Sequence, residues 1–221
     1  MFVSQRIKTI GDFIESGDVL VDVGADHGLL ELYLIAKYPD IKVTAVENKI
    51  GPYQILEENL KAYKNVKLSF SDGIECVSRQ TNTVVIAGMG GLNIVKILSR
   101  YPEKTIRLQK IVIDAHRDIE IARRTIVSFG FKIKQEKIVF EQDKFYVVSE
   151  FVKTINPPVY SNDVMQIGYK LYKDKLWPKY KEYLISKNNQ TIGKIKHLEY
   201  MQDIILNLEK LNERIEKYGK N

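Results

Sequence analysis

The sequence contains little that could crosslink the chain, bind a metal or anchor it in a membrane. Cys76 is the single cysteine among 221 residues, which excludes an intramolecular disulfide and fits a reducing compartment such as the cytoplasm. The three histidines lie far apart in the sequence, so we expect no metal site. No apolar run approaches the roughly 18 residues of a membrane span, and the first residues lack the apolar core of a signal peptide.

The chain also lacks a strong charge of one sign. It has 34 Lys and Arg residues against 28 Asp and Glu residues, a formal net charge of +6. This surplus admits a polyanionic partner but does not require one, because many soluble enzymes carry a similar charge. With 44% hydrophobic residues, the chain can form one core of ordinary size and a small appendage.

Up to residue 153, short apolar runs alternate with amphipathic stretches. The apolar runs predict seven strands, at 19–24, 41–47, 66–71, 83–87, 110–114, 131–140 and 145–152. The amphipathic stretches predict helices at 27–37, 50–62, 92–99 and 119–128. The last two strands follow each other without a helix, and Gln142-Asp143-Lys144 between them is typical of a hairpin turn. We therefore predict an α/β fold with a parallel sheet, helices on both faces and a terminal antiparallel hairpin.

The character of the sequence changes at Asn156-Pro157-Pro158, where two prolines interrupt strand pairing. We place a domain boundary between residues 155 and 156. Beyond it the pattern is helical, with a stripe spaced 3, 4, 3, 4, 3 along Leu198, Met201, Ile205, Leu208, Asn212 and Ile215. Such a stripe is a coiled-coil seam that needs a partner. We favour an antiparallel hairpin with a preceding helix through Tyr169, Leu176, Tyr180 and Tyr183, and pairing between molecules is the alternative.

The strongest local signal is Asp22-Val-Gly-Ala-Asp-His-Gly28, which follows a predicted strand and opens a predicted helix. Glycines at such a turn let a ligand approach the backbone closely. A dinucleotide fingerprint would have glycine in place of Asp26, and a carboxylate there repels a pyrophosphate. S-adenosylmethionine carries a sulfonium and an ammonium group and tolerates that anion. The motif therefore favours a methyl donor over NAD or FAD.

Three further signals stand at later strand ends. Glu47 is placed to accept hydrogen bonds from ribose hydroxyls, unless it is a solvated strand-end carboxylate. Asp72, within Ser71-Asp72-Gly73, is placed to accept from an adenine amino group, unless the segment is an ordinary turn. The run Ile86-Ala87-Gly88-Met89-Gly90-Gly91 permits close backbone approach, with Met89 over a flat ring, unless it is a flexible loop. Their order along the chain is more specific than any one of them.

Together these segments resemble the class I S-adenosylmethionine-dependent methyltransferases. More closely, Asp22-Val-Gly-Ala-Asp-His, Ser71-Asp-Gly, Ile86-Ala-Gly-Met-Gly-Gly and the helical tail resemble the bacterial tRNA (adenine22-N1)-methyltransferases. The resemblance implies a Rossmann-like catalytic domain at residues 1–155, a coiled-coil domain at 156–221 that binds tRNA, and S-adenosyl-L-methionine as cofactor. We also expect a monomer that needs no metal. Two positions depart from the family pattern, because many relatives have Pro in place of Glu31 and Gln-Pro-Asn in place of Asp114-Ala115-His116.

The motifs and the resemblance together indicate the site residues. Asp26 is the expected catalytic carboxylate, which accepts from the exocyclic amine of adenine while N1 attacks. His27 orients Asp26 or contacts the base, unless it makes only a local hydrogen bond at a helix start. The expected cofactor contacts are Asp22, Gly24, Gly28, Glu47, Asn48, Asp72, Gly73, Ala87, Gly88 and Met89. The expected substrate contacts are Arg6, Gly90, Gly91, Arg117, Lys173 and Lys179.

Three alternatives stay open at this point. A Rossmann oxidoreductase is disfavoured by Asp26 and the missing second glycine. A methyltransferase acting on another RNA, on DNA or on a small amine is disfavoured by the basic tail and by the lack of an Asn/Asp-Pro-Pro-Tyr motif after the fourth strand. A binding module without catalysis is disfavoured because Asp26, Glu47 and Asp72 are all present.

Overall fold

A computed structural model describes residues 3–220 of the chain. The chain divides into two compact units, one up to Val159 and one from Tyr160 onward. This division lies four residues beyond the expected boundary. Within residues 3–220, no helix combines the length and the apolar content that crossing a bilayer requires.

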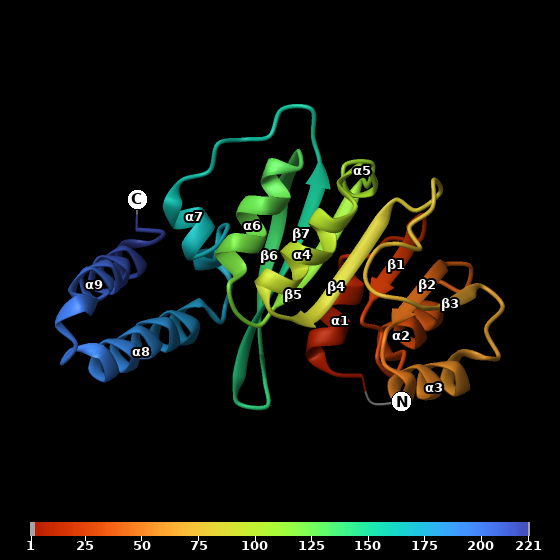
Figure 1. The fold of residues 1–221 in the computed structure, drawn as a ribbon, viewed down its shortest axis with the longest axis horizontal. Helices are drawn as coiled ribbons and strands as arrows, with labels where there is room; N and C mark the ends of the chain where they lie inside the picture. The colour runs from red at the N-terminus through yellow and green to blue at the C-terminus, as the bar shows by residue number, and fades with distance from the viewer. Residues whose placement is uncertain (1–2, 221) are drawn as a thin grey trace. The chain divides into compact units, whose positions relative to one another are not determined.

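The first unit is built on a seven-stranded sheet in the order β3-β2-β1-β4-β5-β7-β6 (Figure 1). Its strands are β1 (Val19–Val23), β2 (Lys42–Glu47), β3 (Val66–Phe70), β4 (Thr83–Met89), β5 (Lys110–Ala115), β6 (Phe131–Glu141) and β7 (Lys144–Lys153). The first five strands pair in parallel, and β7 is antiparallel to both β5 and β6. The predicted fold class is confirmed. The strand order reverses between β1 and β4, and ligands of such sheets bind at the carboxyl ends there.

Helices cover both faces of this sheet. They are α1 (Gln5–Asp12), α2 (Leu29–Lys37), α3 (Ile50–Leu60), α4 (Gly91–Arg100), the short α5 (Pro102–Thr105) and α6 (Ile119–Ser128). Successive residues of a strand face opposite sides, so the burial of Val84, Val85 and Ile86 in β4 requires cover on both faces. On one side, α1 and α2 share a core cluster with Val85. On the other, α4 packs on α6 and both contact strands.

Two turns in the first unit depend on left-handed backbone. Gln142 and Asp143 have φ of 50° and 58°, the conformation of a two-residue hairpin turn that matches strand twist, and the expected hairpin is confirmed. The helix expected at 27–37 begins two residues later, at Leu29. The reason is Gly28, whose φ of 76° is left-handed and cannot belong to a right-handed helix.

The second unit is helical. It contains α7 (Asn162–Gln166), the 3₁₀ turns η1 (Leu171–Lys173) and η2 (Glu199–Met201), and the longer helices α8 (Trp177–Ile195) and α9 (Gln202–Lys217). The helices α8 and α9 pack as an antiparallel pair, joined by Lys181–Glu216 at 2.9 Å near one end and by Asn188–Asn212 at 2.8 Å further along. The expected intramolecular hairpin is therefore observed.

The predicted stripe forms the seam of this hairpin, and one detail of its partner was wrong. Ile205 and Ile215 are buried on α9. The partner helix begins at Trp177 and does not run through Tyr169 and Leu176, because Pro178 favours the first turn of a helix and breaks its interior. Tyr183 remains 38% exposed and lies outside the seam.

Candidate active site

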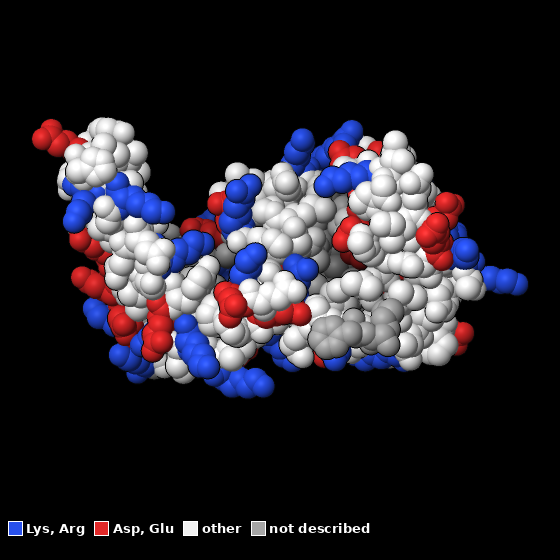
Figure 2. Space-filling model, turned by 90° about the horizontal axis from the view of Figure 1, so that it is seen from below, with Lys and Arg blue, Asp and Glu red and all other residues white. Residues whose placement is uncertain are grey.

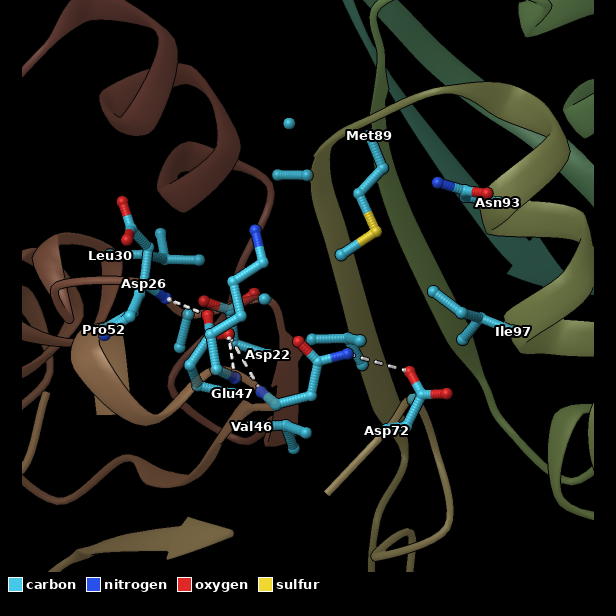
Figure 3. Close-up of a pocket in the computed structure, with 18 of the residues that line it drawn as sticks. Asp22, Asp26, Leu30, Val46, Glu47, Pro52, Asp72, Met89, Asn93 and Ile97 are labelled. Atoms are coloured by element: carbon cyan, nitrogen blue, oxygen red, sulfur yellow. Dashed lines mark hydrogen bonds between the residues drawn. The ribbon is translucent and has the colours of Figure 1, made fainter. Parts of the chain in front are cut away.

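A cavity of about 760 Å³ opens at the carboxyl ends of the parallel strands. Its lining includes most of the residues expected from the sequence: Arg6, Asp22, Gly24, Asp26, His27, Glu47, Asn48, Asp72, Gly73, Ala87, Gly88 and Met89. The loops after β1, β2, β3 and β4 thus meet in one place, as Figure 3 shows for their side chains. The sequence reasoning did not include Lys49, Asn93, Lys96, Arg100 and His116, which also line the cavity.

The turn after β1 approaches β4 closely. Gly24 has a φ of 80°, and a Cβ built on it would lie 2.6 Å from Cε of Met89. The N–H groups of Gly24 and Ala25 both donate to the carbonyl of Val46 at 2.9 Å, which ties the turn to the end of β2. In Figure 3 the side chain of Met89 extends into the cavity across from Asp26. Glycine at position 24 therefore makes room for the methionine that borders the cavity.

Asp26 stands in this turn with a left-handed φ of 52°, which is rare for a residue with a side chain. Its backbone N–H donates to Oε2 of Glu47 at 3.3 Å. The carboxylate itself is 68% exposed and lies 3.4 Å from Nε2 of His27. Asp26 and His27 thus present a carboxylate and an imidazole side by side at the cavity.

Glu47 is buried and fixed in orientation. Oε1 accepts from the N–H groups of Asn48 and Lys49, both at 2.9 Å, and Oε2 accepts from Asp26 (Figure 3). Three backbone donors hold the carboxylate in one orientation. A carboxylate held in this way keeps lone pairs that can accept from ligand hydroxyl groups.

Asp72 lies at the rim between two donors. Nδ2 of Asn48 donates to Oδ1 at 3.3 Å, and a guanidinium nitrogen of Arg100 lies 3.2 Å from Oδ2. Asp72 is exposed, and Gly73 after it has a φ of 84° that turns the chain away from β3. The rim therefore carries an oriented acceptor next to two side-chain donors.

A pair of buried carboxyl groups lies beneath the cavity. Asp22 lines it, and Glu31 on α2 is fully buried beside Asp22. Burial raises the pKa of Asp22 to about 7. Burial, together with the neighbouring charge of Asp22, raises the pKa of Glu31 well above its usual value. Both carboxyl oxygens of Glu31 are buried without a hydrogen-bond partner among the described residues, so burial favours the neutral form of Glu31.

Three expected glycines are closely packed and are not among the residues that line the described cavity. A Cβ on Gly28 would lie 3.0 Å from both Leu56 and Leu60, which pack there from α3. A Cβ on Gly91 would lie 2.1 Å from the carbonyl oxygen of Asp118, so only glycine lets α4 start against that loop. A Cβ on Gly90 would lie 3.0 Å from Nε of Arg117.

The remaining expected substrate contacts are dispersed. The side chain of Arg117 is largely exposed and does not line the described cavity. Lys173 and Lys179 are exposed in the second unit, in η1 and α8. Arg6, from α1, does line the cavity, together with His116 at the end of β5. Among residues 3–220, His, Cys, Asp and Glu side chains form no group of three or more that could hold a metal ion.

Comparison with known proteins places this geometry among enzymes. A family profile described as "Methyltransferase domain" matches residues 3–149. A curated relative, the tRNA (adenine(22)-N(1))-methyltransferase of Bacillus subtilis, is 26% identical over 152 residues. That match covers 66% of this chain and 63% of the relative, so it spans less than two thirds of the relative's length.

Two solved structures match nearly the whole chain. The M1A22 tRNA methyltransferase TrmK of B. subtilis aligns with a TM-score of 0.84 at 20% identity, over 98% of both chains. TrmK of M. capricolum, solved with S-adenosyl-homocysteine, aligns with a TM-score of 0.84 at 22% identity, over 99% of this chain and 98% of that one. At these identities the alignments show that the fold is shared.

Proposed function

Because the chain belongs to the methyltransferase domain family, we propose that it transfers a methyl group from S-adenosyl-L-methionine to N1 of adenine 22 in tRNA. The observation that carries the proposal is the single cavity in which all four strand-end motifs meet. The Bacillus subtilis relative, whose name states this reaction, supports the choice of substrate. The M. capricolum structure, solved with S-adenosyl-homocysteine, supports the choice of donor.

The described residues fit the donor. The cavity volume of about 760 Å³ lies in the range of sites for ligands of this size. Glu47, fixed by three N–H donors, would accept from the ribose hydroxyls, and Asp72 would accept from the adenine amino group. Asp22 would face the ammonium group of the methionine moiety. When bound, the donor supplies an electrophilic methyl group.

The chain's contribution to the reaction is orientation and charge. N1 of adenine attacks through a ring lone pair, so no proton has to leave first. The product is a cation delocalised onto the exocyclic amine, which the carboxylate of Asp26 stabilises by accepting from that amine. His27, 3.4 Å from Asp26, orients the carboxylate. Holding base and donor in contact supplies much of the remaining rate.

We propose tRNA as the partner of the second unit. Residues 154–221 contain 12 Lys and Arg residues against 8 Asp and Glu residues, a surplus of +4. Lys173 and Lys179 are among the exposed cations. On the face drawn in Figure 2, basic and acidic side chains are interspersed and form no single continuous patch. Separate lysines that each contact a phosphate suit a folded RNA that the protein recognises by its shape and charge.

We further propose that the chain acts as a monomer in the cytoplasm. The seam of α9 is already occupied by α8 of the same chain, which supports this state. Light scattering on the protein as it elutes from a size-exclusion column measures its molar mass directly. A mass of twice that of the chain would contradict the proposal.

The function is tested with unmodified tRNA and a donor that carries a labelled methyl group. We expect incorporation of the label and a reverse-transcription stop at nucleotide 22. A tRNA with guanine at that position is the matched control and should remain unlabelled. Label at another nucleotide would contradict the proposed position, and no incorporation into any tRNA would contradict the proposed activity.

A further inference from the structure

We propose that Asp114 is a positioning residue that holds the guanidinium of Arg6 against the imidazole of His116, and that this Arg6–His116 pair is the surface on which the target base stacks. The inference rests on the proposed function and names where, within the same cavity, the base is received. Asp114 and His116 lie at the end of β5, in the segment that departs from the family pattern.

Asp114 is fully buried at the end of β5. Its Oδ2 accepts from Nη1 of Arg6 at 3.0 Å and lies 3.5 Å from Nε2 of His116. Its Oδ1 is buried and accepts from no described residue. A buried carboxylate without its cation is costly, so the charge of Asp114 restrains the guanidinium where it is.

Arg6 in turn fixes the imidazole. Its Nη1 also lies 2.9 Å from Nε2 of His116. Arginine has no acceptor, so a hydrogen bond between these two nitrogens needs Nε2 of His116 as the acceptor. The backbone N–H of His116 donates to the carbonyl of Met89 at 2.9 Å, which ties this residue to the end of β4. Tyr146 on β7 supports both partners, at 5.0 Å from the guanidinium carbon and 5.3 Å from the imidazole centre.

The pair lies across the cavity from the proposed adenosine contacts. Glu47 ends β2 and Asp72 follows β3, on one side of β1, whereas His116 follows β5, on the far side of β4. A Cβ built on Gly88 would lie 3.9 Å from Nη1 of Arg6, which places the guanidinium beside the carboxyl end of β4. The donor's nucleoside and the pair therefore occupy opposite ends of one cavity.

The chemistry of the pair suits a nucleobase. Guanidinium and imidazole groups are planar, and both stack on bases that have been drawn out of an RNA. The side chains of Arg6 and His116 are 27% and 40% exposed, so they remain accessible from the cavity that they line. A planar group at this end would hold the base once it has left its stack.

The test uses the full chain with Asp114→Asn. Most tRNA affinity comes from phosphate contacts, so loss of the stacking surface should reduce the population of correctly placed base and leave tRNA binding largely intact. We expect kcat to fall about 30-fold, with the KM for tRNA and the Kd for S-adenosyl-homocysteine each within about twofold of wild type. The calorimetric stoichiometry for S-adenosyl-homocysteine shows that the cavity remains folded.

The matched control is Asp18→Asn. Asp18 pairs with Lys110, at the opposite end of the same strand β5, in a buried contact of 2.7 Å. The substitution removes a buried ion pair from β5 without touching the cavity, so it should lower stability and leave kcat within about twofold. A large loss of kcat in this control would show that general loosening of β5 explains Asp114→Asn, which would overturn the inference.

A double-mutant cycle tests whether Asp114 acts through Arg6. If it does, Arg6→Ala combined with Asp114→Asn should be no slower than Arg6→Ala alone. Further slowing in the double variant would mean that Asp114 contacts the substrate directly and would overturn the positioning role. If Asp114→Asn raised the KM for tRNA and left kcat unchanged, Arg6 would bind a phosphate and not the base, which would overturn the inference. If Asp114→Asn left both values unchanged, Asp114 would have no positioning role. All these outcomes require an active wild type, whereas an inactive wild type would count against the proposed function itself.

Discussion

Asp26 combines a strained backbone with an exposed side chain. A left-handed φ in a non-glycine residue costs about 1 kcal/mol of folding free energy. The carboxylate of Asp26 is exposed, so burial of this side chain does not offset that cost. We therefore expect Asp26→Gly to stabilise the protein by about 1 kcal/mol while it slows methylation about 100-fold. Thermal unfolding and single-turnover kinetics measure the two effects. Asp26→Asn, which tolerates the same backbone, is the control for strain, and full activity in either variant would refute the catalytic role.

The Asp22–Glu31 pair predicts a pH-dependent stability. The folded chain keeps a proton on Asp22 up to a pKa of about 7, whereas the unfolded chain releases it near the ordinary 3.8. The stability that protonated Asp22 contributes is therefore full below the ordinary 3.8 and is lost as pH rises through about 7.

Burial also raises the pKa of Glu31, so the titration of Glu31 adds to this loss. Glu31→Gln keeps a neutral side chain beside Asp22 and should remove the part of the loss that comes from Glu31. We expect the variant to gain about 1–3 kcal/mol relative to wild type between pH 5 and pH 8, measured by denaturant unfolding at both. Glu57→Gln, at an exposed position of α3, is the control, and its free energy of unfolding should depend on pH as that of wild type does. An unchanged pH slope in Glu31→Gln would show that Glu31 does not titrate with a raised pKa.

At the scale of the element, Gly91 decides where α4 can begin. A side chain there would meet the backbone oxygen of Asp118, which cannot move as a flexible side chain would. Gly91→Ala should cost about 2–3 kcal/mol in chemical unfolding. The control is Gly51→Ala in α3, where a Cβ meets nothing within 4 Å. This substitution should stabilise the protein by up to about 1 kcal/mol, because alanine favours a helix more than glycine does. Equal effects of the two substitutions would contradict the packing role.

Sequence reasoning could predict the elements but not the packing around individual glycines. Strands such as β5 are apolar runs whose pattern needs no tertiary information, and α6 is found at the predicted bounds. Gly28, Gly90 and Gly91 belong to motifs that predict ligand contacts, and these contacts stay predictions; the side chains and backbone that pack around them come from distant segments that the sequence does not reveal. His116 was missed as a lining residue because only the packing of α1 against β5 places Arg6 beside it. Glu31 was noticed as a departure, but its burial beside Asp22 is visible only in the fold.

At the scale of the whole molecule, donor binding and RNA binding should be separable. All residues that line the described cavity precede position 117, whereas the proposed tRNA contacts Lys173 and Lys179 lie in the second unit. Replacing both lysines with alanine should weaken tRNA binding about tenfold and flatten its dependence on salt concentration, with donor affinity unchanged. Filter binding at several salt concentrations measures this. Lys61→Ala with Lys64→Ala, exposed after α3, is the control, and equal losses in the two pairs would contradict a specific role.

The amides across the α8–α9 seam have a mechanical consequence. The side chain of Asn212 accepts a hydrogen bond from Asn188 and donates one to Asn189. If one helix slid past the other by a heptad, both hydrogen bonds would be lost and the amide groups would face apolar positions of the seam. The two hydrogen bonds therefore favour one register of the hairpin. The length of α8, about 28 Å for its 19 residues, therefore stays constant. The lysines of the hairpin keep a fixed spacing, which the flexible phosphate backbone of the proposed tRNA partner would have to match.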